Sequence, residues 1–389
     1  MPKPDIFDIA VVGAGPAGLT AALLAAQSGL RVALLGPTAR QDFRTSALMT
    51  GNVDVLGDAG VWERCAAAAA PLEHLRIVDD TGRLLRAPEA LFDAEEIGQA
   101  AFAWNLPNSV LVSALEQALR ETGMVRFETS VAAVELQEAK AVLSLEDDRS
   151  VEARLAIASD GRRSLLRQAA GIATREWSYP QTAFVTNFSH STPHGNTSTE
   201  FHRPTGPFTL VPLPGNRSAL VSVETSEGAA ALMAMSETEL ARAIERSSHR
   251  ILGEIRPESG RGQFPLGGLV AHQFARRRVM LVGEAAHVVP PIGAQGLNLG
   301  LRDAAAAAAI ASQYSDDPGC DAAMTAFDSA RRSDVGARST MIDLLNRSLL
   351  SPLLPAQIAR SLGLAALRDI GPLRRLFMRQ GMGTARRTG

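Results

Sequence analysis

Glycines near the N-terminus of the chain have the spacing that lets a backbone approach a phosphate group. Gly13, Gly15 and Gly18 form a G-x-G-x-x-G pattern between an apolar run at 6–12 and the helix-forming stretch LTAALLAAQ. The glycines permit a tight turn and close contact with a pyrophosphate, and the N-terminus of the following helix favours its negative charge. This pattern by itself predicts only that an adenine dinucleotide binds.

A second group of residues with chemical potential lies in the stretch 281–303, LVGEAAHVVPPIGAQGLNLGLRD. Glu284 follows a predicted apolar strand, where a carboxylate can accept hydrogen bonds from the hydroxyls of a sugar alcohol. Gly293 and Ala294 would let a flat ring approach the backbone. The alanine-rich helix after them offers unpaired N–H groups and a positive dipole. Together with the glycine pattern, this stretch indicates a flavin pocket.

The second predicted strand ends without the acidic residue that usually accompanies such a glycine pattern. The strand RVALL ends at Gly36, where a carboxylate normally accepts hydrogen bonds from the ribose. We therefore expect the adenosine to be held more weakly than usual or by another group.

The elements that must position these residues form two interleaved domains in our interpretation. The first strand, the glycine turn and the helix lead into RVALL, which is a βαβ unit. Later segments have short alternating runs, such as FTLVPL and SALVSVE, separated by Gly, Pro and Asn turns. We expect an α/β protein with a Rossmann-like FAD-binding domain (1–71, 98–173 and 266–313), an inserted, mainly antiparallel β-sheet substrate domain (72–97 and 174–265) and a helical C-terminal region (314–389).

Composition narrows the function classes. The net charge of −2 over 389 residues gives no general attraction to nucleic acid, so no nucleic-acid partner is expected. Cys65 and Cys320 are isolated, which argues against a disulfide framework or a structural zinc site. We find no separate signal-peptide pattern and no apolar run of about 18 residues. We therefore expect a cytoplasmic protein whose membrane contact, if it has one, is peripheral to the inner membrane.

Three motifs follow one another along nearly the whole chain: GAGPAGL at 13–19, SDGRRSLLR at 159–167 and GEAAHVVPPIGAQGLNLGLRD at 283–303. They resemble the flavin motifs of the single-component aromatic hydroxylases in the para-hydroxybenzoate hydroxylase-like superfamily. Within that group the chain is most similar to the ubiquinone-biosynthesis hydroxylases. That closer similarity is carried by Asp42, Arg44, Ala47 and Leu48, by Gly60-Val61-Trp62, and by tail segments at 340–347, 363–364, 372–375 and 382–383.

Two residues of the last motif depart from the pattern of the ubiquinone enzymes. Glu284 stands where the family usually has aspartate, and it is one methylene longer but still an acceptor. Gly293-Ala294 reverses the common Ala-Gly order and is more similar to para-hydroxybenzoate hydroxylase.

The resemblance implies FAD as the cofactor and assigns contacts to it. Asp160 and Glu284 would hold the region from phosphate to ribityl chain. Arg44 and Asn108 would contact the cofactor from the side, and the backbone at Val131 would meet the adenine. The complete implied set of cofactor-binding residues is Gly13, Gly15, Pro16, Ala17, Gly18, Arg44, Asn108, Val131, Asp160, Gly283, Glu284, Pro291, Gly293, Ala294, Gln295, Gly296, Leu297 and Asn298.

The resemblance also implies the reaction. Reduced FAD would react with molecular oxygen to give a flavin C4a-hydroperoxide, which delivers one hydroxyl to an electron-rich ring. Side chains would mainly position the ring and exclude water, with Pro291 and His287 closest to the chemistry. His287 would serve either in proton transfer or, in the plainer interpretation, as a structural hydrogen-bonding group of the loop. Only one dinucleotide pattern is present, so NAD(P)H would bind transiently or a protein would donate the electrons.

Three functions remain open at this point. The first is hydroxylation of a polyprenylated phenol in ubiquinone synthesis. The second is hydroxylation of a small soluble aromatic compound, which a polar pocket with an arginine facing the ring would favour over an apolar one. The third is a non-catalytic FAD-binding member of a biosynthetic complex, which Gly36 makes conceivable.

Two further features have competing interpretations. His190, His194 and His202 could suggest a metal, but Pro193 breaks helical spacing between them, so we expect ordinary loop histidines and no metal. The tail 331–389 has eleven arginines and three acidic residues, interleaved with leucine-rich runs. Such a tail could lie on an anionic membrane, pack against another copy in a homo-oligomer, or form a solvated basic face on helices covering the FAD domain.

Overall fold

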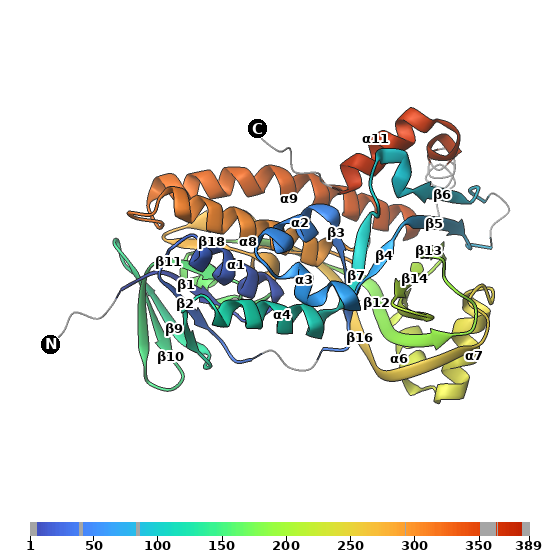
Figure 1. Cartoon of the computed structure of the whole chain (residues 1–389), viewed down its shortest axis with the longest axis horizontal. Helices are drawn as coiled ribbons and strands as arrows, with labels where there is room; N and C mark the ends of the chain where they lie inside the picture. Colours follow the sequence, from blue (N-terminus) through green and yellow to red (C-terminus); the bar gives the residue numbers. More distant parts are fainter. Residues whose placement is uncertain are drawn as a thin grey trace.

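Parallel strands form the first layer of the protein. The computed structural model describes residues 6–38, 42–82, 86–291, 293–350, 363 and 365–382. Five strands run parallel in the order β18-β11-β1-β2-β8, and β17 and the hairpin β9-β10 extend this sheet. Figure 1 shows the hairpin β9-β10 at the lower left of the molecule. The members of the sheet are β1 (Phe7–Val12), β2 (Val32–Leu35), β8 (Val125–Phe127), β9 (Val131–Leu136), β10 (Ala141–Leu145), β11 (Ser150–Ala158), β17 (Ala275–Arg276) and β18 (Val279–Leu281).

The central strands β1, β2 and β18 are almost wholly apolar and largely buried, as expected for parallel strands covered on both faces. Helix α1 (Pro16–Gln27) packs against α8 (Gln295–Gln313) and α4 (Asn108–Arg120). The hexa-alanine run at 304–309 lies inside α8, where small side chains permit close packing. The short helix α5 (Leu165–Ala169) follows β11.

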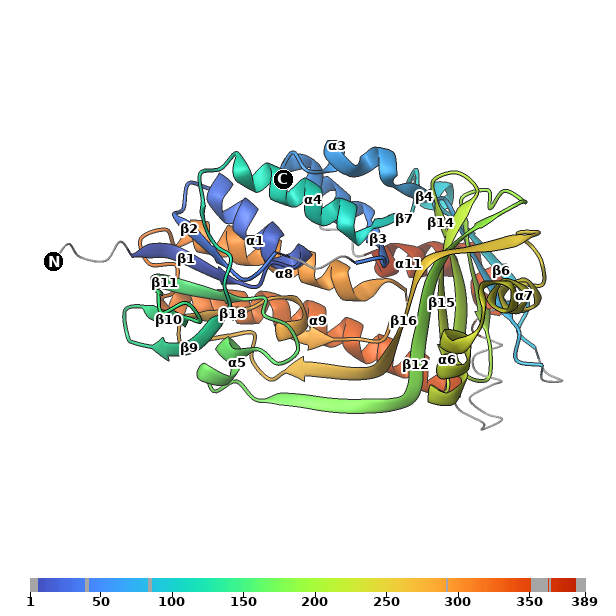
Figure 2. The same ribbon diagram turned by 90° about the horizontal axis from the view of Figure 1, so that it is seen from below.

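A second sheet lies mainly in the segments predicted to form the substrate domain, with its strands in the order β19-β16-β12-β15-β14-β13-β5-β6. Its pairs are antiparallel except β13 with β5. Helices α6 (Ser226–Ala234) and α7 (Glu237–Ser247) cover one face and enclose an apolar core around Phe184, Phe188 and Phe201 (Figure 2). The strands are β5 (His74–Asp79), β6 (Ala90–Asp93), β12 (Thr174–His190), β13 (Thr197–His202), β14 (Pro207–Leu213), β15 (Arg217–Glu224), β16 (Ile255–Ala271) and β19 (His287–Val288).

The predicted α/β architecture is confirmed, and the structure refines how its two parts join. Strands β12 and β16 run the length of both domains in Figure 2, so the predicted boundary between residues 265 and 266 falls inside β16. Residues 267–271 of β16 lie at the FAD-domain end. A small third sheet, β3-β7-β4, also lies between the domains, with α2 and α3 after β3. These elements are β3 (Thr45–Met49), α2 (Thr50–Asp58), α3 (Trp62–Cys65), β4 (Ala70–Leu72) and β7 (Ala103–Pro107).

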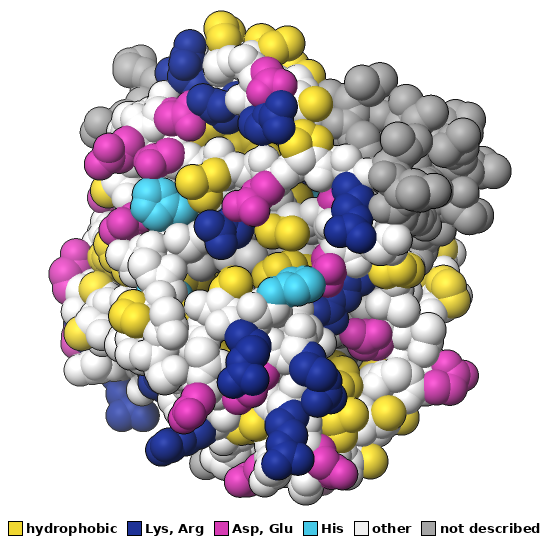
Figure 3. Space-filling model, turned by 90° about the vertical axis from the view of Figure 1, so that its right-hand side faces the viewer, with side chains coloured by type: hydrophobic (Ala, Val, Ile, Leu, Met, Phe, Trp, Pro, Cys, Tyr) yellow, Lys and Arg dark blue, Asp and Glu magenta, His cyan; other side chains and the backbone are white. Residues whose placement is uncertain are grey.

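The C-terminal region is helical where it is described. Helix α9 (Asp321–Leu350) begins against the FAD domain, with Phe327 and Val335 in its core. Helix α11 (Gly371–Met382) packs on the substrate domain near β6, at the top of the face in Figure 3. The tail residues Arg360, Leu364, Gly383, Arg386 and Arg387 lie outside the described residues. Among the described helices, none has the length and apolar character needed to cross a membrane.

Candidate active site

The glycine turn between β1 and α1 is tightly packed at Gly13 and Gly18 and open at Gly15. A Cβ at Gly13 would lie 2.2 Å from the carbonyl oxygen of Ser159, and one at Gly18 would lie 2.0 Å from the carbonyl oxygen of Gly13. Gly13 also has a φ of +110°, which disfavours other residues. A Cβ at Gly15 would meet nothing within 4 Å. The turn therefore leaves room in front of α1, where a pyrophosphate fits the dipole and the unpaired N–H groups of that helix.

Close packing between small residues brings the second motif against the first. A Cβ at Gly300 of α8 would lie 3.2 Å from the Cα of Gly283 and 3.3 Å from the Cβ of Ala17. Ala17 follows Pro16, the first residue of α1. The two stretches that suggested a flavin pocket are almost 270 residues apart in sequence, and these contacts place them side by side.

The two predicted carboxylates differ in their surroundings. Asp160 Oδ2 accepts a hydrogen bond of 2.7 Å from the N–H of Leu165 at the start of α5, so Asp160 also has the structural role of a turn residue. Its Oδ1 is buried and has no partner among the described residues, and burial raises the pKa of Asp160. Glu284, in the 3₁₀ turn Gly283–Ala285, is exposed and makes no hydrogen bond to a described residue. Both carboxylates thus have acceptors available for cofactor hydroxyls.

Arg44 and Asn108 meet through a third residue that the sequence interpretation did not include in the site. The Arg44 guanidinium donates two hydrogen bonds of 2.8 Å to Asp42, and Asn108 Nδ2 donates one of 2.9 Å to the same carboxylate. Burial alone would raise the pKa of Asp42, but these hydrogen bonds hold it below its ordinary value. The pKa of Arg44 is raised by Asp42 and further by the charge of Glu284. These hydrogen bonds join the residues just before β3 to the start of α4, and the charge of Glu284 in the last motif acts on the same arginine.

Asn298 anchors the loop before α8. Its Nδ2 donates to the carbonyl oxygens of Ala47 and Ala294, both at 2.7 Å. Its Oδ1 accepts from the N–H of Met49 at 2.8 Å and from Asn52 Nδ2 at 2.7 Å. Protein groups therefore occupy both polar atoms of the Asn298 amide. The side chain positions the loop and has no free polar atom with which to contact the cofactor.

The loop itself presents backbone groups. Ala294 has a left-handed conformation, with a φ of +54°, and caps α8 without a side-chain hydrogen bond. Helix α8 begins at Gln295, followed by Gly296 and Leu297. The first N–H groups of any helix have no carbonyl of an earlier helical turn to donate to. Gly293 and the exposed Pro291 precede this helix, and Ile292 lies outside the described residues. This end of α8 fits the electron-rich edge of a flavin ring.

His287 belongs to a buried ionic cluster beneath this loop. Its Nε2 lies 2.6 Å from Asp303 Oδ2, and Asp303 Oδ1 accepts a hydrogen bond of 2.7 Å from Arg331 Nε. The N–H of Gly283 donates to Asp303 at 3.0 Å. All three side chains are buried. The structure thus gives His287 a structural hydrogen bond, the plainer of the two interpretations. The sequence offered a reason to include Asp303 in the site, because it is the last residue of the third motif. It offered no such reason for Arg331, which lies on α9.

A small cluster of apolar side chains, which we call the apolar wall, packs against the flavin loop. Ala294 packs against residues from the small third sheet and from β14. Ala47, Met49, Leu72, Ala103 and Val211 form this cluster. The wall therefore joins the FAD domain to the substrate domain at the loop where a ring would approach the cofactor.

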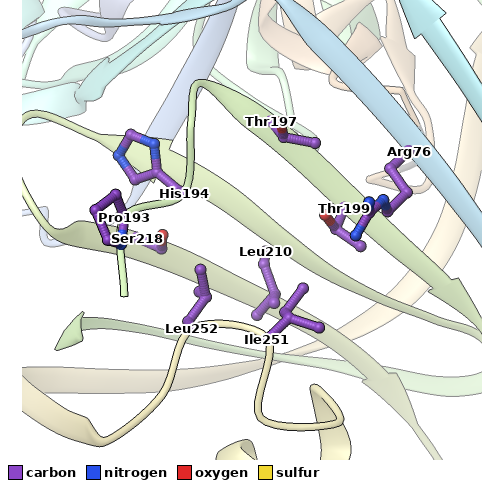
Figure 4. Close-up of a pocket in the computed structure, with 9 residues that line it drawn as sticks. All are labelled: Arg76, Pro193, His194, Thr197, Thr199, Leu210, Ser218, Ile251 and Leu252. Carbon is purple, nitrogen blue, oxygen red and sulfur yellow. The ribbon is translucent and has the colours of Figure 1, made fainter. Parts of the chain in front are cut away.

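A cavity of about 160 Å³ lies on the face of the second sheet that is opposite to the apolar wall. None of its lining residues belongs to the three motifs. Arg76, His194, Thr199 and Ser218 are among its lining residues (Figure 4). His194 Nε2 lies 3.0 Å from the carbonyl oxygen of Leu213. Of the three histidines predicted to lie in loops, His194 does so, whereas His190 and His202 are the last residues of strands β12 and β13. His190 contacts Ser218 Oγ and the Thr192 carbonyl, and His202 contacts Glu200.

Comparisons with known proteins agree with this geometry. The FAD binding domain family matches residues 7–338. Ubiquinone hydroxylase UbiL of Rhodospirillum rubrum is 32% identical over 97% of this chain and 90% of its own. The 3-demethoxyubiquinol 3-hydroxylase of Escherichia coli is 28% identical over 97% and 98%. The fold is that of p-nitrophenol 4-monooxygenase from Pseudomonas putida, with a TM-score of 0.80 at 19% identity, covering 98% of this chain and all of the other.

The fold and the site together define an FAD-binding flavin monooxygenase. More particularly, the chain belongs to the ubiquinone-biosynthesis hydroxylase family of FAD-dependent monooxygenases. It is an FAD-dependent aromatic hydroxylase, which uses molecular oxygen and an aromatic substrate.

Replacing Glu284 by alanine should weaken FAD binding by roughly 5- to 150-fold, because cofactor hydroxyls would lose their acceptor. Thermal unfolding of the apoprotein should stay unchanged, since Glu284 is exposed and unbonded to described residues. Asp160→Ala should weaken FAD binding and also lower the unfolding temperature, because it removes the hydrogen bond to α5. Flavin fluorescence titration and calorimetry measure the two effects. Unchanged FAD affinity in both variants would show that the carboxylates do not face the cofactor.

Proposed function

We propose that this protein hydroxylates the ring of a polyprenylated phenol intermediate in ubiquinone biosynthesis. The observation that carries the proposal is the apolar wall beside Ala294, formed from both domains. A hydrocarbon substituent on the ring is compatible with such a wall, whereas a ring carboxylate would require a cation there. Arg44, the motif arginine near the loop, is engaged by Asp42. The names of the two similar hydroxylases support the same substrate class.

Bound FAD, reduced by NAD(P)H or by a protein donor, supplies the oxygen chemistry that side chains lack. The residues of this chain provide the rest. The open turn at Gly15 and the start of α1 hold the pyrophosphate, and Asp160 and Glu284 hold the hydroxyls of the ribityl region. Asn298 fixes the loop, and the first turn of α8 would face the flavin and favour negative charge there. The wall around Ala294 orients the ring and excludes water.

Lipid analysis of a strain lacking the gene tests this function. We expect a polyprenylated phenol that lacks one ring hydroxyl to accumulate and ubiquinone to fall. The wild-type gene should restore ubiquinone, and a gene carrying Gly15→Ala should not. The proposal would be contradicted if the deletion strain made normal amounts of ubiquinone and had no second enzyme that hydroxylates the same ring carbon.

We also propose that α11 rests on an anionic membrane surface, from which such a substrate would be taken. One side of this helix packs on the substrate domain through Met378, next to Phe92. Its other side leaves apolar residues exposed: Leu373 and Leu376, with Ile370 just before the helix. Residues 365–382 include four arginines and one aspartate. Apolar and basic side chains lie together at this end of the molecule in Figure 3, a combination typical of interfacial helices.

Charge removal should separate this membrane proposal from subunit packing. Arg375→Gln combined with Arg379→Gln should weaken binding to anionic vesicles by about 1 kcal/mol per charge, and added salt should weaken binding of the parent. Arg332→Gln together with Arg149→Gln is the matched control, because these arginines lie away from α11. Co-sedimentation with phosphatidylserine vesicles measures binding. Binding that ignores both salt and the α11 charges would contradict the proposal.

A further inference from the structure

The backbone conformation at the end of β2 disfavours the acidic side chain that usually holds the ribose. Gly36 follows β2 with a φ of +138°, a conformation that disfavours other residues. A Cβ there would lie 3.4 Å from the Ala14 nitrogen and 3.5 Å from the Cα of Gly13. The glycine turn therefore packs against Gly36 itself, and another element must supply any ribose acceptor.

The neighbouring strand places a carboxylate at the same level. Strands β2 and β8 are parallel, with Leu35 opposite Phe127. The N–H of Gly36 donates to the Phe127 carbonyl at 3.0 Å, so the register continues past the end of β2. Glu128 is the next residue after Phe127. It therefore stands beside the position where the acidic residue of β2 is missing.

Glu128 is held and still has an acceptor to offer. Thr38 Oγ1 donates a hydrogen bond of 3.2 Å to Glu128 Oε1. Its Oε2 makes no hydrogen bond to another residue in the part of the chain that the structure describes. The side chain is exposed, as a group that meets a ligand at the sheet edge must be before the ligand binds. Val131, implied to lie at the adenine, begins β9 three residues later.

We propose that Glu128 binds the adenosine ribose of FAD and takes over the function of the acidic residue absent at Gly36. Its carboxylate accepts hydrogen bonds from the ribose hydroxyls, and Thr38 sets its orientation. A carboxylate suits this task because each of its oxygens can accept, so that two vicinal hydroxyls can be held together. The proposal rests on FAD binding by the family and is independent of the substrate of the hydroxylation.

The test compares FAD with an analogue that lacks both hydroxyls on the adenosine ribose. The full-length apoprotein is titrated with each, and flavin fluorescence gives the two dissociation constants. The parent should bind FAD about tenfold or more tightly than the analogue, because hydrogen bonds to a charged group are lost. Glu128→Ala should bind FAD as weakly as the parent binds the analogue, and it should no longer distinguish the two ligands. Thr38→Val should reduce the preference only in part.

Glu135→Ala is the matched control, since Glu135 is an exposed carboxylate on β9 of the same domain. It should keep the preference of the parent. A parent that binds both ligands equally would overturn the proposal, because the ribose hydroxyls would then not be recognised. A Glu128→Ala variant that keeps the preference would also overturn it. If Glu128→Ala weakened the binding of FAD and of the analogue by the same factor, the preference would be kept, and Glu128 would have a structural role only.

Discussion

Replacing Gly15 by alanine should deprive the protein of FAD while leaving its fold intact. The added methyl group meets no protein atom within 4 Å, and the φ of −77° at this residue is open to alanine. The methyl group would, however, occupy the space through which a pyrophosphate approaches the backbone. We expect the FAD dissociation constant to rise at least about tenfold, equivalent to about 1.4 kcal/mol. Fluorescence titration and the absorbance of the purified protein measure this loss.

Gly18→Ala provides the contrast within the same turn. Its methyl group would lie 2.0 Å from the Gly13 carbonyl oxygen and 2.3 Å from Ser159 Oγ, so strand and helix must move apart. Overpacking of this kind costs about 1–3 kcal/mol, and the unfolding temperature of the apoprotein should fall. The apoprotein carrying Gly15→Ala should unfold near the temperature of the parent. If Gly15→Ala kept full FAD affinity, the pyrophosphate would have to bind elsewhere.

Asp303→Asn should be among the most destabilising single substitutions in the chain. Asp303 is fully buried, and the change removes the charge that pairs with Arg331 and that contacts His287. Breaking a buried ion pair costs about 3–5 kcal/mol when the remaining charge is left uncompensated, and the second pair of Arg331, with Asp334 at 3.0 Å, offsets part of that cost. Urea or thermal unfolding measures the loss. Asp147→Asn, which breaks an exposed pair with Arg149, is the control and should change stability little.

The same residue predicts a pH dependence. Burial alone would raise the pKa of Asp303, but His287 and Arg331 hold it below its ordinary value. The stabilisation from this carboxylate is therefore complete above the ordinary carboxyl pKa of about 4 and is lost as the pH falls toward the lowered value. Acid unfolding of the parent should include this contribution, and Asp303→Asn should lack it. An unchanged acid transition in the variant would contradict the assigned ion pair.

Sequence reasoning succeeded where function depends on local backbone chemistry. The glycine turn and the loop before α8 are both encoded within about twenty residues, so residue spacing alone predicted their shape. Arg44 and Asn108 were assigned by resemblance, and the structure brings them together. Local patterns could not show that β12 and β16 are continuous through both domains, and the predicted boundary after residue 265 therefore fell inside β16.

The contacts that sequence reasoning missed join residues far apart in the chain. Asp303 pairs with Arg331 of α9, and Asn298 bonds to the backbone of β3 about 250 residues away. Glu128 became interpretable only when the parallel register placed it beside Gly36. Such partners depend on tertiary packing, which periodicity and composition do not encode.

A single turnover with labelled oxygen tests the central claim most directly. The FAD-loaded protein is reduced by light without oxygen, with EDTA oxidised as the sacrificial electron donor, so that no natural electron donor is needed. It is then mixed with ¹⁸O₂ and the polyprenylated phenol that accumulates in the deletion strain. The account predicts a product with one ¹⁸O atom in a new ring hydroxyl, and no such product from the variant carrying Gly15→Ala. Hydrogen peroxide as the sole oxygen product, with the phenol recovered unchanged, would contradict the account.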